Sequence, residues 1–207
     1  MSPQTAHRLL RIAAAHDLVI VEDDILAEFE PSPSPRLAIL DGLDRVIRIG
    51  SFSKTISASA RCGYIAARAE WIDGLVDLQV ATSFGGPSPM ATELIADVLA
   101  GGSYRKHIAE LRQRLARSRD RAVDRLADLG MVPWTMPRGG FYLWCRLPEQ
   151  LDSADIARRC MDDGVILAPG NVFSISQSAA PFLRFNVAQM EDDRVYRALR
   201  LAMSGKP

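Results

Sequence analysis

Short runs of β-branched residues constrain the fold of this chain more than any other feature. Residues 18–21 and 46–49 have the composition of buried strands, and residues 63–66 resemble a third. Residues 31–35 carry three prolines, so the connection between the first two strands contains an irregular loop. Segments with helical spacing surround these strands. We therefore predict a chain of mixed α/β texture, with these runs as strands of its first half.

Residues that typically begin or end helices mark the helical segments of the chain. Ser2 and Pro3 form a typical helix start, and Gly101-Gly102 ends a helical pattern. Together with the apolar spacing, these signals predict helices from Ser2 and over residues 71–80, 89–100, 104–129, 153–162 and 192–203. Short strands are expected at 141–145, 165–167 and 183–187. We predict a division into residues 1–103 and 104–207, the second comprising a linking helix and a small α+β domain.

The balance of charge and the spacing of the cysteines and histidines argue against several classes of function. Lys plus Arg and Asp plus Glu both number 25, so the balance of charge favours neither nucleic acid nor a membrane surface. Cys62, Cys145 and Cys160 show no CxxC spacing, and the three histidines are scattered, which argues against a disulfide framework and against a metal site. No signal peptide or apolar span is apparent, so we expect a cytoplasmic protein.

A lysine follows the second predicted strand. Lys54 stands in Ser51-Phe52-Ser53-Lys54-Thr55, and ligand sites of α/β folds lie beyond the carboxyl ends of strands. A lysine there can form an imine with a carbonyl cofactor, although a lone lysine in a serine-rich loop is more often an ordinary surface residue. Arg61, with the hydroxyls of Ser51 and Ser53, would hold a phosphate dianion beside it.

Two further features carry chemistry. Residues 22–24, Glu-Asp-Asp, end the first predicted strand and offer a carboxylate at the mouth of the same sheet, where it would keep a pyridine nitrogen protonated. Arg184 stands inside the apolar strand at 182–187 and requires an anionic partner. That partner is either a nearby Asp or Glu or a substrate carboxylate gripped by two hydrogen bonds.

These motifs together resemble the class I and II aminotransferases of pyridoxal-phosphate (PLP) fold type I. The resemblance rests on residues 21–24, 51–54 and 61–64, and on Arg-Gly-Gly-Phe-Tyr at 138–142 and Leu-Ala-Pro-Gly at 167–170. Ser-Phe-Ser-Lys, with Ala-Pro-Gly-Asn-Val-Phe and Leu-Arg-Phe-Asn, is most similar to the MocR branch. In that branch this domain follows a GntR-type winged helix that binds DNA.

The resemblance implies a role for each candidate residue. Lys54 would form the Schiff base with PLP and shuttle a proton, and Asp23 would pair with the pyridine nitrogen. Arg61, Ser51 and Ser53 would hold the phosphate. Arg184 would bind the carboxylate of an amino acid or 2-oxo acid. Residues 1–103 would form the C-terminal part of the PLP-binding large domain, an α/β domain with a mixed sheet, and the full-length form would be a homodimer.

The chain also departs from the family pattern. A Gly-rich phosphate loop, a ring-stacking aromatic residue and an Asn-Pro-x-Gly turn precede the matched region in the family, so we expect an N-terminally truncated chain with a partial sheet and a weakened pocket. Leu26 stands where relatives commonly have a tyrosine whose hydroxyl contacts the cofactor.

Three functions follow as alternatives. The first is amino-group transfer between an amino acid and a 2-oxo acid through Lys54. The second is effector sensing by a PLP-binding domain of a MocR/GntR-type transcriptional regulator, with no direct nucleic-acid contact from these residues. The third is a truncated remnant without activity. An upstream reading frame that encodes a winged helix would favour the second.

Overall fold

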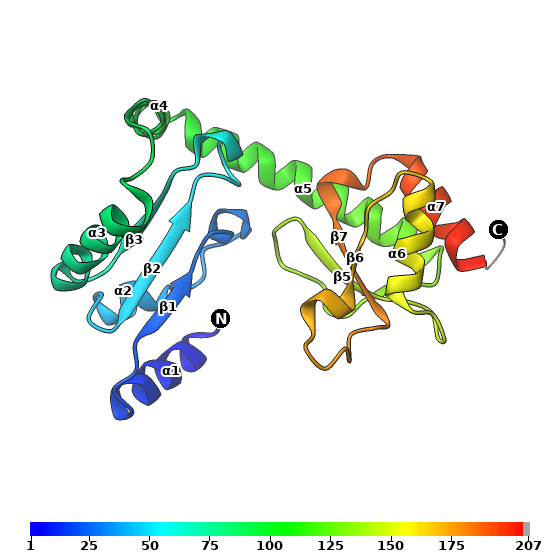
Figure 1. The fold of residues 1–207 in the computed structure, drawn as a ribbon, viewed down its shortest axis with the longest axis horizontal. Coiled ribbons are helices and arrows are strands. Elements are labelled where there is room, and N and C mark those ends of the chain that lie inside the picture. Colours follow the sequence, from blue (N-terminus) through cyan, green and yellow to red (C-terminus); the bar gives the residue numbers. More distant parts are fainter. Residues whose placement is uncertain (205–207) are drawn as a thin grey trace. The chain divides into compact units, whose positions relative to one another are not determined.

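The computed structural model describes residues 1–204, and the chain divides into two compact units, Met1–Ala109 and Glu110–Pro207 (Figure 1). Each unit contains its own sheet. Both combine helices and strands, which confirms the α/β prediction. None of the helices within residues 1–204 has the length and apolarity that crossing a bilayer requires.

The sheet of the first unit has the order β1-β2-β3, with β1 at Ile20–Asp23, β2 at Val46–Ser51 and β3 at Gly63–Ala66. Strands β1 and β2 are parallel, whereas β3 runs antiparallel to β2, so the predicted mixed sheet is confirmed. The first strand was predicted two residues too early. Residues 18 and 19 connect helix and strand instead, because the backbone N–H of Leu18 turns back to the carbonyl of Ala13.

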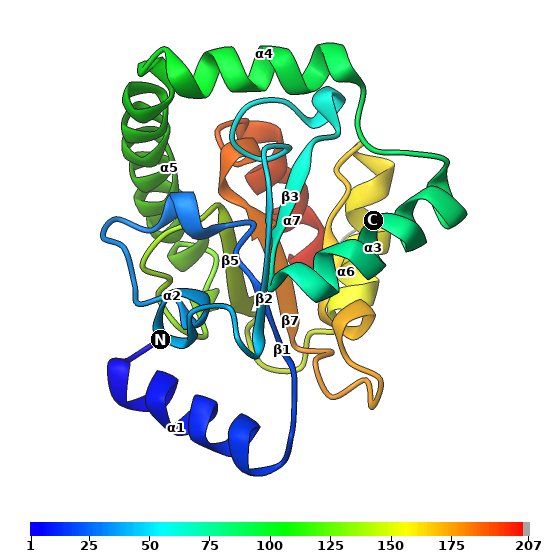
Figure 2. The same cartoon turned by 90° about the vertical axis from the view of Figure 1, so that its left-hand side faces the viewer.

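Five helices begin in this unit: α1 (Pro3–Ala15), α2 (Leu37–Asp41), α3 (Ala69–Ser83), α4 (Pro89–Ala100) and α5 (Ser103–Ala127). The Ser2 hydroxyl accepts the backbone N–H of Thr5 at 3.1 Å and caps α1 as predicted. Helix α2 was not predicted, because its five residues are too few to show a period. Helices α4 and α5 meet at a sharp turn in which Gly102 has a φ of +73° (Figure 2).

The two faces of this sheet differ. Val46 packs in a buried cluster with Ala6 of α1 and with Leu37 and Ala38 of α2. Successive side chains of a strand point to opposite faces of the sheet. The face opposite Val46 therefore carries Val21 and Ile65, both exposed, together with Asp23. One face is thus the core of the unit, and the opposite face carries a site carboxylate among apolar residues.

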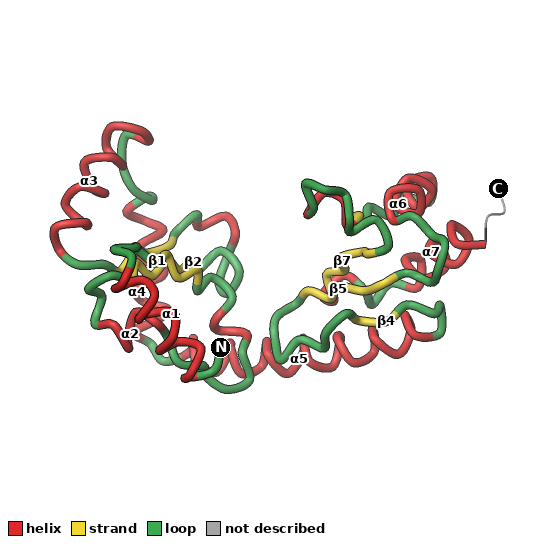
Figure 3. Tube along the Cα trace, turned by 90° about the horizontal axis from the view of Figure 1, so that it is seen from below, coloured by secondary structure: helices red, strands yellow, loops and turns green. Residues whose placement is uncertain are grey.

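The second unit has an antiparallel sheet of order β4-β5-β7-β6, drawn in Figure 3, with helices α6 (Ser153–Asp162) and α7 (Asp193–Ser204). Its strands are β4 (Val132–Pro133), β5 (Tyr142–Arg146), β6 (Ala168–Pro169) and β7 (Phe182–Asn186). The α+β texture predicted for this region is confirmed. The strand predicted at 165–167 is wrong, since pairing with β7 begins only at Ala168.

Successive side chains of β5 and β7 point to opposite faces of this sheet, so one face is buried and the other is half-exposed. Leu143, Leu183 and Phe185 are almost completely buried and belong to the core of the unit. Trp144 and Arg184 lie opposite each other in the register of the two strands and point to the other, half-exposed face. The arginine that the sequence places in an apolar strand is therefore outside the core.

Candidate functional site

Strand register brings most of the predicted site residues to one end of the first sheet. Asp23 pairs with Ile49 in the parallel ladder, and Ser51 pairs with Gly63 in the antiparallel one. Parallel strands end at the same edge, and the antiparallel β3 begins there. Asp23, the loop that carries Lys54, and Arg61 therefore meet at this end.

Three successive carboxylates at the end of β1 have three different environments. Glu22 accepts the backbone N–H groups of Leu37 and Ala38 at 2.8 and 3.1 Å and so caps helix α2. Asp24 is almost buried. Asp23 accepts only the N–H of Ile25, at 3.1 Å through one oxygen, and its other oxygen has no partner within residues 1–204. Of the three, only Asp23 has a carboxylate oxygen available for a ligand.

Asp24 is the centre of an ion-pair network. Its carboxylate lies 2.9 Å from Nε of Arg36 and 2.6 Å from a terminal nitrogen of Arg48. Burial by itself would lower the pKa of Arg36, but the charges of Asp24 and Glu30 outweigh it and raise that pKa. The network links β1, β2 and the segment before α2, and it stabilises the strand end that presents Asp23.

Hydrogen bonds order the backbone around Lys54. The N–H of Phe52 donates to the carbonyl of Cys62 at 3.0 Å, and the carbonyl of Phe52 accepts three N–H groups from residues 55–57. The Ser51 hydroxyl accepts the N–H of Ser53 at 3.1 Å. Lys54 itself is exposed, and its amine makes no hydrogen bond or ion pair within the described residues. A structured loop thus presents an uncommitted amine.

Close approach of β2 and β3 brings Arg61 near this loop. A methyl group on Gly63 would lie 2.6 Å from the carbonyl oxygen of Gly50, so this position requires glycine. Arg61 has a left-handed backbone with a φ of +48°, which is strained for a residue with a side chain. Its guanidinium is exposed and forms no ion pair with any carboxylate of residues 1–204. The positive charge is therefore available to an anion.

Arg184 belongs to the second unit, where two aromatic rings flank its guanidinium. The guanidinium carbon lies 4.4 Å from the ring centre of Tyr142 and 4.4 Å from that of Phe173. The described residues contain no ion pair of Arg184, so the salt bridge considered from the sequence is absent there. The rings restrict the guanidinium without neutralising its charge.

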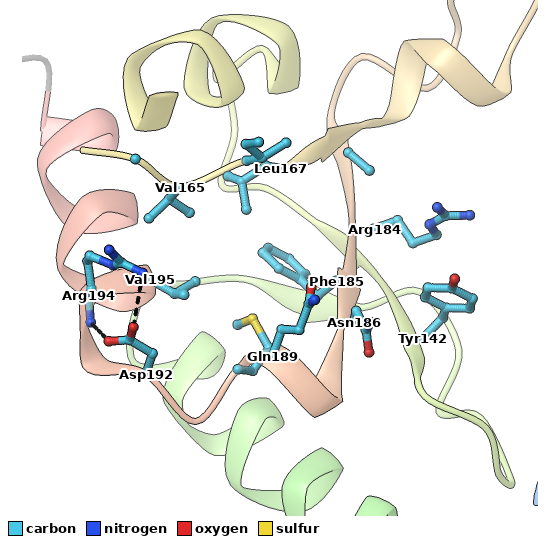
Figure 4. A pocket seen from close by; sticks show the side chains of 14 residues that line it. Tyr142, Val165, Leu167, Arg184, Phe185, Asn186, Gln189, Asp192, Arg194 and Val195 are labelled. Atoms are coloured by element: carbon cyan, nitrogen blue, oxygen red, sulfur yellow. Dashed lines mark hydrogen bonds and ion pairs between the residues drawn. The ribbon is translucent and has the colours of Figure 1, made fainter. Parts of the chain in front are cut away.

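A hollow of about 670 Å³ lies beside Arg184 (Figure 4). Figure 4 shows Arg184 and Tyr142 together at one side of it, with an ion pair between Asp192 and Arg194 at the other. Its lining also includes the apolar side chains of Val165, Leu167, Phe185, Met190 and Val195. A cationic group thus adjoins a hollow that is lined by both apolar and polar side chains.

The donor set of the first unit fits pyridoxal phosphate. It combines an amine, an uncommitted carboxylate oxygen, a free guanidinium and serine hydroxyls at one end of a sheet. Buried Thr55 Oγ has no hydrogen-bond partner within the described residues, which leaves a polar atom unsatisfied beside the lysine. Thr55, Tyr142 and Phe173 were not among the predicted site residues, although each stands in a quoted motif. Thr55 directly follows Lys54, Tyr142 ends the motif at 138–142, and Phe173 ends Ala-Pro-Gly-Asn-Val-Phe.

Two solved structures that are similar to this chain are aminotransferases. The multiple substrate aminotransferase of Thermococcus profundus matches 99% of the chain and 52% of its own length, with a TM-score of 0.85 and 25% identity. The kynurenine aminotransferase of Pyrococcus horikoshii, solved with PMP, matches the same shares with a TM-score of 0.84 and 27% identity. The fold is therefore PLP fold type I, as predicted.

The chain belongs to the family "Aminotransferase class I and II", whose model matches residues 1–201. Among curated proteins, the HTH-type transcriptional regulator YdcR of Escherichia coli is 29% identical over an alignment of 207 positions, which covers 97% of this chain and 43% of YdcR. NorG of Staphylococcus aureus, another HTH-type transcriptional regulator, is 27% identical over 195 residues, 92% of this chain and 43% of NorG. The chain thus spans less than half the length of these relatives, and the similarity to the regulator branch is confirmed.

Proposed function

We propose that this chain binds pyridoxal phosphate covalently through Nζ of Lys54 and takes part in amino-group transfer between an amino acid and a 2-oxo acid. The observation that carries the proposal is the meeting of Lys54, Asp23 and Arg61 at one end of a sheet, each with an uncommitted group. In this proposal, residues 1–103 act as part of a cofactor-binding large domain. Residues 104–207 form the linking helix and small domain.

Each residue has a definite task. PLP supplies a carbonyl that condenses with amines and a ring that withdraws electrons from the substrate carbon. Asp23 would hold a proton on the ring nitrogen, while Arg61, Ser51 and Ser53 would bind the phosphate. Lys54 Nζ, set free when the amine of the substrate takes its place on the cofactor, would take the proton from the substrate α-carbon and return it to another carbon. Arg184 would bind the substrate carboxylate.

A second candidate function uses the same site. The curated relatives named above are HTH-type transcriptional regulators, which favours a role in sensing an amino compound that binds PLP. Binding would then alter DNA contact by another part of a longer protein, with no direct contact from these residues. We further propose that the full-length form is a homodimer, to be checked by light scattering.

The chain is well suited to a test of covalent binding, because it contains only three lysines, Lys54, Lys106 and Lys206. PLP would be added, the adduct reduced with borohydride, and the modified peptides mapped by mass spectrometry. We expect label at Lys54, loss of that label in Lys54→Ala, and its retention in Lys106→Ala. Equal labelling of all three lysines, or none, would support the alternative of an inactive remnant.

A second measurement separates the two active alternatives. The PLP-loaded chain would be mixed with single amino acids, and the release of a 2-oxo acid would be followed by mass spectrometry. Stoichiometric release supports amino-group transfer. A change in visible absorption without any 2-oxo acid supports sensing, because the ligand then binds without completing transfer.

A further inference from the structure

The loop that carries Lys54 is connected to helix α5 by one side chain. Nε2 of His107, in the second turn of α5, lies 2.8 Å from the backbone carbonyl oxygen of Thr55. A carbonyl oxygen can only accept, so Nε2 carries the hydrogen and donates it. Because both the neutral Nε2–H tautomer and the charged imidazole can donate, either form supports this bond.

The surroundings of Thr55 combine burial with an unpaired hydroxyl. Thr55 is 3% exposed, yet its hydroxyl has no hydrogen-bond partner within residues 1–204. A hollow of about 260 Å³ lies where Ile56 of the loop meets Val98 of α4 and His107 of α5. The bond from His107 is a specific polar connection between the loop and the helix.

The carbonyl of Thr55 is directly adjacent to Lys54 in the chain. The N–H groups of Thr55, Ile56 and Ser57 all donate to the carbonyl of Phe52, at 3.3, 2.8 and 3.2 Å. All three bonds share one acceptor, and those of Thr55 and Ser57 are longer than that of Ile56, so a further bond adds to the order of this turn. The bond from His107 fixes the carbonyl of Thr55, which lies in the peptide plane between Thr55 and Ile56, and so restricts the loop directly after Lys54.

We infer that His107 is a positioning residue that fastens the Lys54 loop to helix α5, so that the order of the loop and the order of the first turns of α5 depend on each other. Helix α5 is continuous from Ser103 to Ala127 and crosses the division between the two units at residue 109. The inference deepens the proposed function, and the role that it gives to Lys54 rests on that function. The hydrogen bond between His107 and Thr55 does not depend on it.

The test uses two substitutions of His107 in the whole chain. His107→Phe keeps a ring and removes the donor, whereas His107→Gln keeps an N–H donor at a similar distance from the backbone. His107 lies at the surface, so neither change opens the core. His7→Phe, at an exposed position of α1, is the matched control.

The first readout is amide hydrogen exchange without any PLP. We expect exchange of the amides of residues 55–57 and 107–109 to rise about three- to tenfold in His107→Phe. It should remain near wild type in His107→Gln and His7→Phe, and β2 and β3 should be unaffected in all variants. Unchanged exchange in His107→Phe would overturn the inference, whatever the chain does with PLP.

The second readout is the rate of borohydride-trapped labelling at Lys54, with labelling at Lys106 and Lys206 as internal references. Labelling at Lys54 should slow severalfold in His107→Phe and recover in His107→Gln. Equal rates in wild type and His107→Phe would overturn the positioning role. If wild type shows no preference for Lys54 while the exchange result holds, the proposed function fails and the connection between loop and helix stands.

Discussion

A terminal nitrogen of Arg48 lies 2.6 Å from the carboxylate of Asp24, and this ion pair distinguishes Asp24 from its neighbour Asp23. The Asp24 side chain is 7% exposed and is also bound by Arg36, whereas Asp23 is exposed and accepts one backbone N–H. Two adjacent aspartates therefore have separate roles. One stabilises the strand end, and the other is available to a ligand.

Substitution should separate these roles. Asp24→Asn removes the charge between two arginines and should lower the free energy of unfolding by about 2–3 kcal/mol, because Arg48 loses its counter-ion and Arg36 keeps only Glu30. Asp23→Asn should change it by less than about 0.5 kcal/mol, as is usual for a surface residue, but should weaken retention of PLP. Urea denaturation and dialysis of the loaded chain measure the two effects. Equal losses of stability would contradict this assignment.

Gly63 should tolerate no side chain. Gly63→Ala places a methyl group against the backbone carbonyl of Gly50, and neither backbone can move without breaking the β2–β3 pairing. We expect a loss of about 1–3 kcal/mol in the free energy of unfolding. Gly74→Ala is the control, since Gly74 lies in α3 with open space around it and should gain about 0.5–1 kcal/mol. A neutral Gly63→Ala would show that the two strands separate at this point.

Stability should fall at alkaline pH because of two buried thiols. Burial raises the pKa of Cys145 to about 12, and burial together with Asp163 raises that of Cys160 to about 11. Both ionise near 9.0 in the unfolded chain. Between pH 9 and about 11 the unfolded chain thus releases protons that the folded chain retains, which favours unfolding as the pH rises.

The urea midpoint measured at pH 8, 9 and 10 checks this pH dependence. The decline from pH 8 to 10 should be shallower in a Cys145→Ala, Cys160→Ala double variant than in wild type, since tyrosines and lysines titrate equally in both. Parallel declines would exclude the two thiols as its cause. Mass spectrometry should also find slow alkylation of both cysteines in the folded chain at pH 8.

Arg184 should contribute to binding of carboxylate ligands more than to stability. It has no ion pair within the described residues, so Arg184→Lys should leave the thermal midpoint nearly unchanged while losing the two-point grip on a carboxylate. We expect the amino acid concentration that half-saturates the absorption change of the PLP-loaded chain to rise about tenfold or more. Arg194→Lys is the control, because Arg194 lines the same hollow but already pairs with Asp192. Equal effects of both changes would contradict a special role for Arg184.

Local signals predicted many elements closely. Helices α4 and α6 begin and end at the predicted residues, because Pro89 with Gly101 and the Asp152 side chain mark their ends. Prediction failed for strands whose bounds depend on pairing with another strand and not on the composition of the segment itself. Residues 165–167 are as apolar as a strand, yet the ladder with β7 starts at Ala168, and two-residue strands such as β4 have no period to detect.

The sequence by itself determined the fold class, the order of the elements and the motif around Lys54, because these depend on local composition and on residues close together in the chain. Only the tertiary structure decided which charged and polar side chains near the motif have no partner within the described residues. Glu22 and Asp24 are bound by residues 12 to 24 positions away, and Thr55 in the Lys54 loop is bound by a histidine 52 positions away. Such partners come together only when the strands pair and the helices pack.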